Sequence, residues 1–258
     1  MKNITEWEGD VLQRRKYALF LTRYLINKNS SSVINITAPW GSGKTFFMER
    51  WFQDIKINHP AVYFNAWQND YSNDPLISLI SSIISQILSL NEEGQQTEAT
   101  TNLLKKSSAI IKKLSPMIVK GILRKYIGED GLEEFSKTTK DTEDTIADIS
   151  GKLTEELLEN FKQTENLIAE FKKSISALIE NPSNKKLQKP LFIFIDELDR
   201  CRPNFAIELL EKIKHIFNIE DVIFIIATDT RQLSYSIKAI YGQDFNGETY
   251  LRSPRRSD

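Results

Sequence analysis

The chain has 258 residues, 40% of them hydrophobic and 27% charged, which excludes wholesale disorder or a fibrous repeat and leaves enough apolar content for a core. Its net charge of −1 gives no overall attraction to nucleic acid. One cysteine, Cys201, excludes an intramolecular disulfide framework, and with only two histidines beside it the composition argues against a structural zinc site.

The N-terminal stretch carries acidic residues and lacks the apolar segment of a signal peptide. No run of about 18 uncharged apolar residues occurs, so the sequence predicts no transmembrane segment and a cytoplasmic, reducing location. The first expected element is a helix over Val11 to Ile26, where apolar residues recur with helical spacing.

The next segment has the spacing of a phosphate-binding P-loop, also called the Walker A motif. Val33 to Thr37 is rich in β-branched residues and predicts a buried strand, and Thr45 to Lys56 predicts a helix. Between them lies APWGSGKT, with Ala38 where the first glycine of the motif usually stands. The glycines let backbone N–H groups surround an anion at the helix N-terminus. The predicted phosphate-binding residues are Ala38, Pro39, Trp40, Gly41, Ser42, Gly43, Lys44, Thr45 and Phe46.

Two of these residues have separate expected roles. Lys44 is placed to reach the β- and γ-phosphates of a nucleotide, and the Thr45 hydroxyl is an expected ligand of Mg²⁺. The alternative, a Gly-rich turn without a ligand, is disfavoured because the loop follows a strand and opens a helix.

A second strand is expected over Pro60 to Asn65 and a helix over Leu76 to Leu90, after which the pattern changes. Residues 91–189 show long helical patterns and no strand, which predicts a helical insertion. Its first part, Leu103 to Lys125, is basic and contains no acid. This stretch is either a solvated helix face or a surface for nucleic acid or anionic membrane, so a nucleic-acid partner stays open. Its second part, Ile146 to Leu178, carries the apolar seam of an amphipathic helix.

The α/β pattern returns with a buried strand over Leu191 to Ile195, which ends in two adjacent acids. Such a strand end is typical of a Walker B motif. Asp196 is an expected Mg²⁺ ligand, and Glu197 is expected to orient and activate the attacking water. Alone, the pair could be a solvated strand end. The upstream P-loop favours the catalytic interpretation.

A further apolar strand, Val222 to Ala227, ends in Thr228 and Asp229. Ligands of parallel α/β sheets bind at the carboxyl ends of the strands, so either residue is a candidate sensor of the γ-phosphate. The turn is equally typical of a helix N-cap. Arg200 and Arg202 are candidates for phosphate contacts or for surface ion pairs.

The predicted fold is therefore a three-layer α/β P-loop NTPase with a mainly parallel sheet and a long helical insertion between the Walker A and Walker B motifs. The expected domains are residues 1–90 and 190–251 as the two halves of the core, residues 91–189 as the insertion, and residues 252–258 as a basic tail.

Four motifs in order resemble the KAP family of P-loop NTPases: APWGSGKT, the FNAW stretch at Phe64 to Trp67, IDELDRCRP at Ile195 to Pro203, and the late YGQDFNGETYL. The resemblance covers both α/β portions. It implies an ATPase core with a catalytic glutamate and an association with bacterial phage defence. Membrane-spanning members carry apolar hairpins in the insertion, whereas this insertion is charged. Members also continue past the YL motif into another strand and a helical lid, which this sequence is expected to lack.

Motifs and resemblance together predict hydrolysis of ATP with Mg²⁺ by Lys44, Thr45, Asp196 and Glu197, with Thr228 or Asp229 as sensor and Asp10 to Tyr17 beside the adenine. A nucleotide-gated switch with little turnover, which signals through the insertion to an effector protein or a second copy, is the main alternative. A P-loop kinase is disfavoured, because kinases need an acceptor site and usually lack a glutamate directly after the strand-end aspartate.

Overall fold

The computed structural model describes residues 7–28, 32–72, 74–89, 98–114, 152–180, 187–216 and 219–252. The chain divides into two compact units, Met1–Thr97 with Ser176–Asp258, and Glu98–Ile175. The α-helices are α1 (Arg15–Asn27), α2 (Lys44–Lys56), α3 (Pro75–Leu88), α4 (Glu98–Leu114), α6 (Lys152–Glu180), α7 (Pro203–Ile216), α8 (Thr230–Tyr241) and α9 (Gly247–Arg252). The strands are β1 (Ser32–Thr37), β2 (Ala61–Asn65), β3 (Leu191–Asp196) and β4 (Val222–Thr228), and two 3-10 helices are η1 (Trp67–Asn69) and η2 (Leu198–Arg200).

The first unit is built on a parallel sheet with the strand order β1-β4-β3-β2. Ile34 of β1 pairs with Ile225 of β4, and Phe194 of β3 pairs with the same Ile225 from the other side. Because all four strands run in one direction, their carboxyl ends meet at one edge. The predicted parallel sheet is confirmed, and the P-loop and both predicted acids follow strands at this edge.

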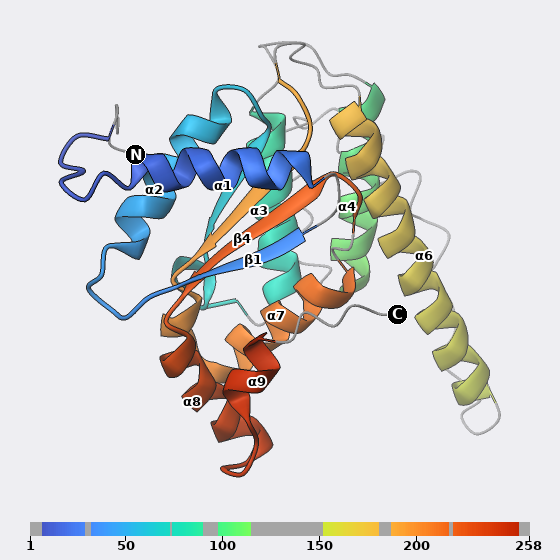
Figure 1. Ribbon diagram of the computed structural model, residues 1–258. Helices are drawn as coiled ribbons and strands as arrows, with labels where there is room; N and C mark the ends of the chain where they lie inside the picture. Colours follow the sequence, from blue (N-terminus) through green and yellow to red (C-terminus); the bar gives the residue numbers. More distant parts are fainter. Residues whose placement is uncertain are drawn as a thin grey trace. The chain divides into compact units, whose positions relative to one another are not determined.

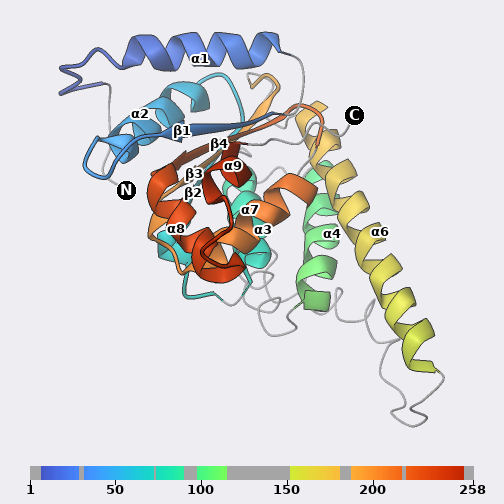
Figure 2. The same cartoon turned by 60° about the horizontal axis from the view of Figure 1, so that its bottom comes forward.

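Helices cover both faces of the sheet, so the unit has three layers, as predicted. α1 and α2 lie on one face, and α3, α7, α8 and α9 lie on the other, as Figures 1 and 2 show. The core on the α1 and α2 face is rich in aromatic side chains. Trp51 of α2 packs edge-on against Phe194 of β3, with ring centroids 5.4 Å apart. This contact fixes the helix that opens with Lys44 against the strand that ends with Asp196.

Two elements differ from the sequence expectation. The first helix begins at Arg15 rather than at Val11, because the Asp10 carboxylate accepts the backbone N–H groups of Arg14 and Arg15 at 2.8 and 3.0 Å. The strand before the P-loop is not buried as predicted. β1 pairs only with β4 among the described strands, and Val33 is exposed. A strand with one neighbour keeps an open side, which apolar content alone does not reveal.

The second unit contains α4 and part of α6, which are joined by an ion pair of 2.7 Å between Lys106 and Glu170. Much of the basic stretch Leu103 to Lys125 lies outside the described residues. Ile146 and Ile149, in the predicted apolar seam, also lie outside them.

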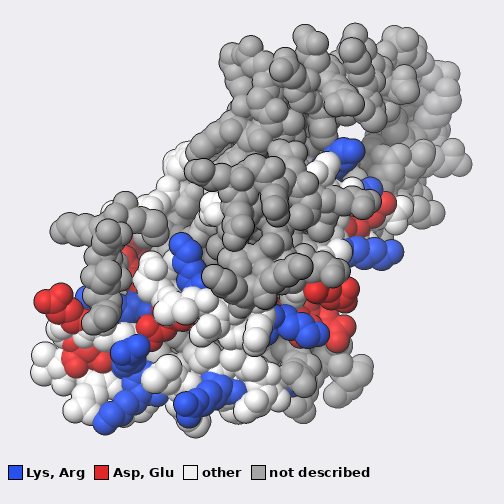
Figure 3. Space-filling view, turned by 90° about the horizontal axis from the view of Figure 1, so that it is seen from above, with Lys and Arg blue, Asp and Glu red and all other residues white. Residues whose placement is uncertain are grey.

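On the face shown in Figure 3, basic and acidic side chains of the described residues alternate. That part of the surface therefore offers mixed charge.

The buried aromatic contact predicts a large stability effect. Trp51 is fully buried and donates its indole N–H to the Thr22 hydroxyl at 2.8 Å. We expect Trp51→Ala to lower the free energy of unfolding by about 3–5 kcal/mol in urea titrations, because it leaves a cavity between α2 and β3. Tyr71→Ala is the control, since Tyr71 is 85% exposed and should change that free energy by about 0.5 kcal/mol at most. Equal effects of the two substitutions would contradict this assignment of the core.

Candidate phosphate-binding site

The loop between β1 and α2 has the backbone shape of an anion nest. Gly41 and Gly43 adopt positive φ angles of 77° and 82°, which turn successive N–H groups to one side. α2 begins at Lys44, so the positive end of the helix dipole faces the same loop. A side chain at position 43 would be strained by the φ angle, and its Cβ would lie 2.7 Å from Arg14 Nη1, so the Arg14 side chain would have to shift.

Arg14, just before α1, holds this loop from outside. Its guanidinium donates to the carbonyl oxygens of Ser42 and Gly43 at 2.9 and 3.1 Å. These two hydrogen bonds tie the P-loop to the segment before α1. The adenine contact expected for residues 10–17 stays a prediction, and none of these residues lines the pocket described next.

A pocket of about 210 Å³ lies over the loop. It is lined by Trp40, Gly41, Gly43, Lys44, Thr45, Asp196, Glu197, Asp199 and Arg200. The fold therefore brings Lys44 of the Walker A motif and Asp196 of the Walker B motif, which are 152 positions apart in the chain, to one cavity. Lys44 donates its ammonium protons to the carbonyl oxygens of Ala38 and Pro39 at 2.7 and 3.3 Å.

Asp196 is buried, and each of its carboxylate oxygens accepts a hydrogen bond. Tyr63 on β2 donates its hydroxyl to Oδ2 at 2.8 Å, and the Glu197 backbone N–H donates to Oδ1 at 2.8 Å. Burial, and then the neighbouring Asp196 carboxylate, raise the pKa of the Tyr63 hydroxyl, so it stays a neutral donor. Burial, followed by the same carboxylate, also raises the pKa of Glu49 on α2. These contacts fix the orientation of Asp196.

Glu197 has a left-handed backbone with φ 59°, which is costly for a residue with a Cβ and typical of functional sites. Asn65, the last residue of β2, donates its side-chain N–H to Oε2 at 3.0 Å. Arg200 forms an ion pair with Oε1 at 3.1 Å and stands 5.8 Å from the Trp67 ring centroid. The carboxylate is thus held in the pocket by partners on two segments.

The other sequence candidates lie beside the pocket and do not line it. Thr228 is buried and donates its hydroxyl to Asn35 Oδ1 on β1 at 2.9 Å. Asp229 is the N-cap of α8, where its Oδ1 accepts the N–H groups of Arg231 and Gln232.

Two further candidates make contacts elsewhere. The Phe46 ring lies 3.4 Å from the Arg50 guanidinium. Arg202 pairs with Asp70, with 2.9 Å between Nε and Oδ1, so it occupies the surface ion pair that was one of its two expected roles.

Sequence reasoning assigned no role to Tyr63, Asn65 or Asp199. Asp199 stands within the Walker B segment, but its spacing does not show that it turns back to the P-loop. Tyr63 and Asn65 are two positions apart near the carboxyl end of β2. Their alternation on a strand of otherwise apolar residues is the one signal that could have indicated a role at this edge.

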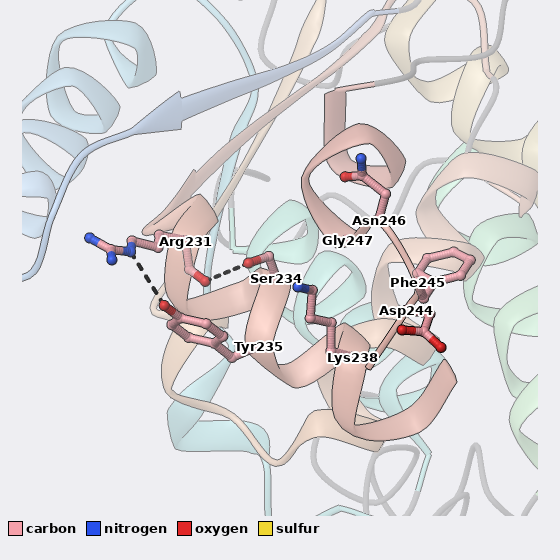
Figure 4. A pocket seen from close by; sticks show the side chains of 8 residues that line it. All are labelled: Arg231, Ser234, Tyr235, Lys238, Asp244, Phe245, Asn246 and Gly247. Carbon is pink, nitrogen blue, oxygen red and sulfur yellow. Dashed lines mark hydrogen bonds between the residues drawn. The ribbon is translucent and has the colours of Figure 1, made fainter. Parts of the chain in front are cut away.

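A larger hollow of about 510 Å³ lies beside α8 and is lined by Arg231, Ser234, Tyr235, Lys238, Asp244, Phe245, Asn246 and Gly247. In Figure 4 its side chains come from α8 and from the loop before α9, and the Arg231 guanidinium stands next to the Tyr235 hydroxyl. Size does not decide between the two cavities. The smaller one is the candidate site because it combines an anion nest, a lysine and strand-end acids.

No described helix combines the length and apolarity needed to cross a bilayer. The sequence matches the model of the KAP family P-loop domain over residues 14–253. No curated protein matches the sequence. The fold search matches the ORC2 protein of Aeropyrum pernix, solved as ADPNP–ADP complexes, at 16% identity and a TM-score of 0.37. That match covers 93% of this chain and 47% of that protein, so the chain spans about half of its length.

The reactivity of the buried Cys201 thiol tests the placement of the acidic residues around it. Burial, and then Asp70, Asp199 and Glu197, raise the pKa of its thiol to about 12 from the ordinary 9.0. We therefore expect iodoacetamide at pH 8 to modify the native chain about 1000-fold more slowly than the urea-unfolded chain, because the thiolate is the nucleophile. The same raised pKa contributes stability below pH 9 that is lost as the pH rises towards 12. Equal alkylation rates in the two states would place Cys201 outside this environment.

Proposed function

This chain belongs to the KAP family of P-loop domains, and on that premise we propose that it binds ATP with Mg²⁺ and hydrolyses it to ADP and phosphate. The observation that supports this most is the convergence of Lys44, Thr45, Asp196 and Glu197 on one pocket. We also propose the setting that the family resemblance implies, a component of a bacterial phage-defence system.

The residues present fit a nucleotide triphosphate. The nest at Gly41 and Gly43, together with the start of α2, supplies N–H donors for phosphate oxygens. The Lys44 side chain is only 10% exposed, so its charge acts in a poorly screened environment. Lys44 would exchange its bonds to Ala38 and Pro39 for bonds to the β- and γ-phosphates.

The site also fits Mg²⁺. Thr45 and Asp196 line the same pocket and offer the oxygen ligands that this ion prefers. The described residues hold no group of three or more acidic, His or Cys side chains suited to a metal ion by themselves. Phosphates and water would therefore supply the other ligands, as is usual for Mg²⁺ with nucleotides. The bound ion would neutralise charge that develops on the phosphoryl oxygens.

Glu197 is the proposed residue that orients the attacking water. A carboxylate has about four lone-pair positions, and Asn65 and Arg200 use one on each oxygen. Each oxygen can still accept a proton from water. The contacts with Asn65 and Arg200 hold the carboxylate in place, so the chain would not have to order it at the moment of reaction.

The same contacts favour a second function. The Arg200 cation lies 3.1 Å from Glu197 Oε1, so this oxygen would be shared between Arg200 and an attacking water. A chain in this state would bind nucleotide and hydrolyse it slowly, as a switch read by an effector protein or a second copy. A turnover rate that rises when such a partner is added would distinguish the switch from a constitutive ATPase.

Two substitutions separate nucleotide binding from hydrolysis. We expect Lys44→Ala to weaken ATP binding at least about tenfold, because it removes a charge-assisted contact with phosphate. We expect Glu197→Gln to keep that affinity and to lower turnover about 100-fold or more, because it removes the group that activates water. Calorimetry and phosphate release measure the two effects, with Lys56→Ala at the far end of α2 as a control. Turnover at the unmodified rate in Glu197→Gln would show that the catalytic assignment is wrong.

The contact between Tyr63 and Asp196 gives a separate test of the metal site. Tyr63→Phe removes only the hydroxyl that orients Asp196, and losing such a partner of a metal ligand typically costs about tenfold or more in metal affinity. We expect the Mg²⁺ concentration for half-maximal phosphate release to rise by about that factor. Tyr24→Phe is the matched control, because Tyr24 is exposed on α1. An unchanged Mg²⁺ requirement in Tyr63→Phe would argue against Asp196 as the ligand.

A further inference from the structure

Asp199 is a buried acid at the site to which the proposed reaction assigns no role. It lies on η2, three residues after Asp196, and its side chain is only 2% exposed. A buried carboxylate without partners would be strongly destabilising, so the groups that satisfy it indicate its role.

Three groups approach one oxygen of this carboxylate. Oδ2 accepts the Trp40 indole N–H at 2.6 Å and the Asp229 backbone N–H at 2.9 Å. The Lys44 ammonium stands 3.7 Å from the same oxygen. Two of these groups belong to the P-loop, and the third belongs to the turn after β4.

The two hydrogen bonds fix the carboxylate in place. Trp40 is tied to the same turn a second time, because its backbone N–H donates to Asp229 Oδ2 at 3.3 Å. Asp229 in turn is held as the N-cap of α8. The Asp199 charge therefore cannot move away from Lys44 without breaking several contacts.

This arrangement has a consequence for any phosphate that binds. The β- and γ-phosphates and Asp199 are both anionic, and both use the Lys44 ammonium. When phosphates take Lys44, the fixed carboxylate remains beside them, and like charges at such a distance repel in a poorly solvated pocket. Asp199 thus stabilises the nucleotide-free loop and opposes the bound state.

We propose that Asp199 is a positioning residue that sets the nucleotide affinity of the P-loop: it holds Lys44 in the absence of phosphate and, fixed by Trp40 and Asp229, opposes the terminal phosphates that replace it. This inference rests on the proposed function, since it assumes that a nucleotide binds at Lys44. It assigns to the third acid of the DELD segment a role distinct from metal binding and water activation.

Asp199→Asn tests the charge alone, because the amide oxygen can still accept from Trp40 and Asp229. We expect this variant to bind ADP and ATP at least about fivefold more tightly, the lower limit for two charges about 4 Å apart in bulk water. AMP, which lacks the β- and γ-phosphates, should bind the variant and the unmodified chain equally. The tightening should persist without Mg²⁺. Dissociation constants come from calorimetry, or from displacement of a fluorescent ADP analogue for weak ligands.

Trp40→Phe tests the fixing contact, and its expected effect has the same sign as that of Asp199→Asn but is smaller. Without its closest donor, the carboxylate can move away from the phosphates, so ADP should bind about threefold more tightly, the cost of a modest hydrogen bond. In the Asp199→Asn background the same substitution should have no such effect, because the competing charge is gone. A direct contact between Trp40 and nucleotide would instead weaken binding in both backgrounds. Trp40 is half exposed on the loop, so this test stands even where Asp199→Asn fails to fold.

The outcomes separate the inference from the function beneath it. If the unmodified chain binds neither ADP nor ATP, the proposed function fails and the inference fails with it. If the unmodified chain binds nucleotide and Asp199→Asn binds ADP with equal or lower affinity, only the role of Asp199 is wrong. Weaker binding of ATP that appears only with Mg²⁺ would show that Asp199 supports the metal instead, which also overturns the proposal.

Discussion

The site depends on the packing of α2 against β3. Trp51 and Phe52 of α2 both place their rings edge-on against Phe194, with centroid distances of 5.4 and 5.7 Å. Close-packed aromatic contacts of this kind allow little relative movement. They set the position of the helix that begins at Lys44 relative to the strand that ends at Asp196. Groups separated by most of the chain can therefore hold a geometry that phosphate chemistry requires.

Hydrogen bonds or ion pairs hold each of the three acidic residues at the carboxyl end of β3. Tyr63 and a backbone N–H orient Asp196, Asn65 and Arg200 orient Glu197, and Trp40 and a backbone N–H fix Asp199. Carboxylates that lie near one cavity at low exposure need hydrogen-bond donors to offset the loss of water. The donors come from β2, from the segment after β3, from the P-loop and from the turn after β4, so the arrangement of the acids is a property of the whole sheet edge.

The contacts of Arg14 extend this dependence to the segment before α1. Its guanidinium binds two P-loop carbonyls, and the Asp10 carboxylate caps the backbone at Arg14 and Arg15. The short segment 10–15 thus connects the first helix to the phosphate-binding loop. A change in the position of α1 would act on the loop through these bonds, which gives the outer layer of the fold a physical connection to the site.

The sequence by itself determined the local elements and the motifs. The runs before the P-loop and before Asp196 indicate strands because β-branched and apolar residues favour them, and the glycines of the loop indicate a nest because only they adopt positive φ at low cost. The strand order and the partners of each acid were decided by the tertiary structure. Pairing of Tyr63 with Asp196, or of Asp199 with Trp40, joins residues that are 133 and 159 positions apart, and no periodicity records such contacts. The open side of β1 has the same origin, since burial depends on which strands are neighbours and the apolar pattern of one strand does not contain that information.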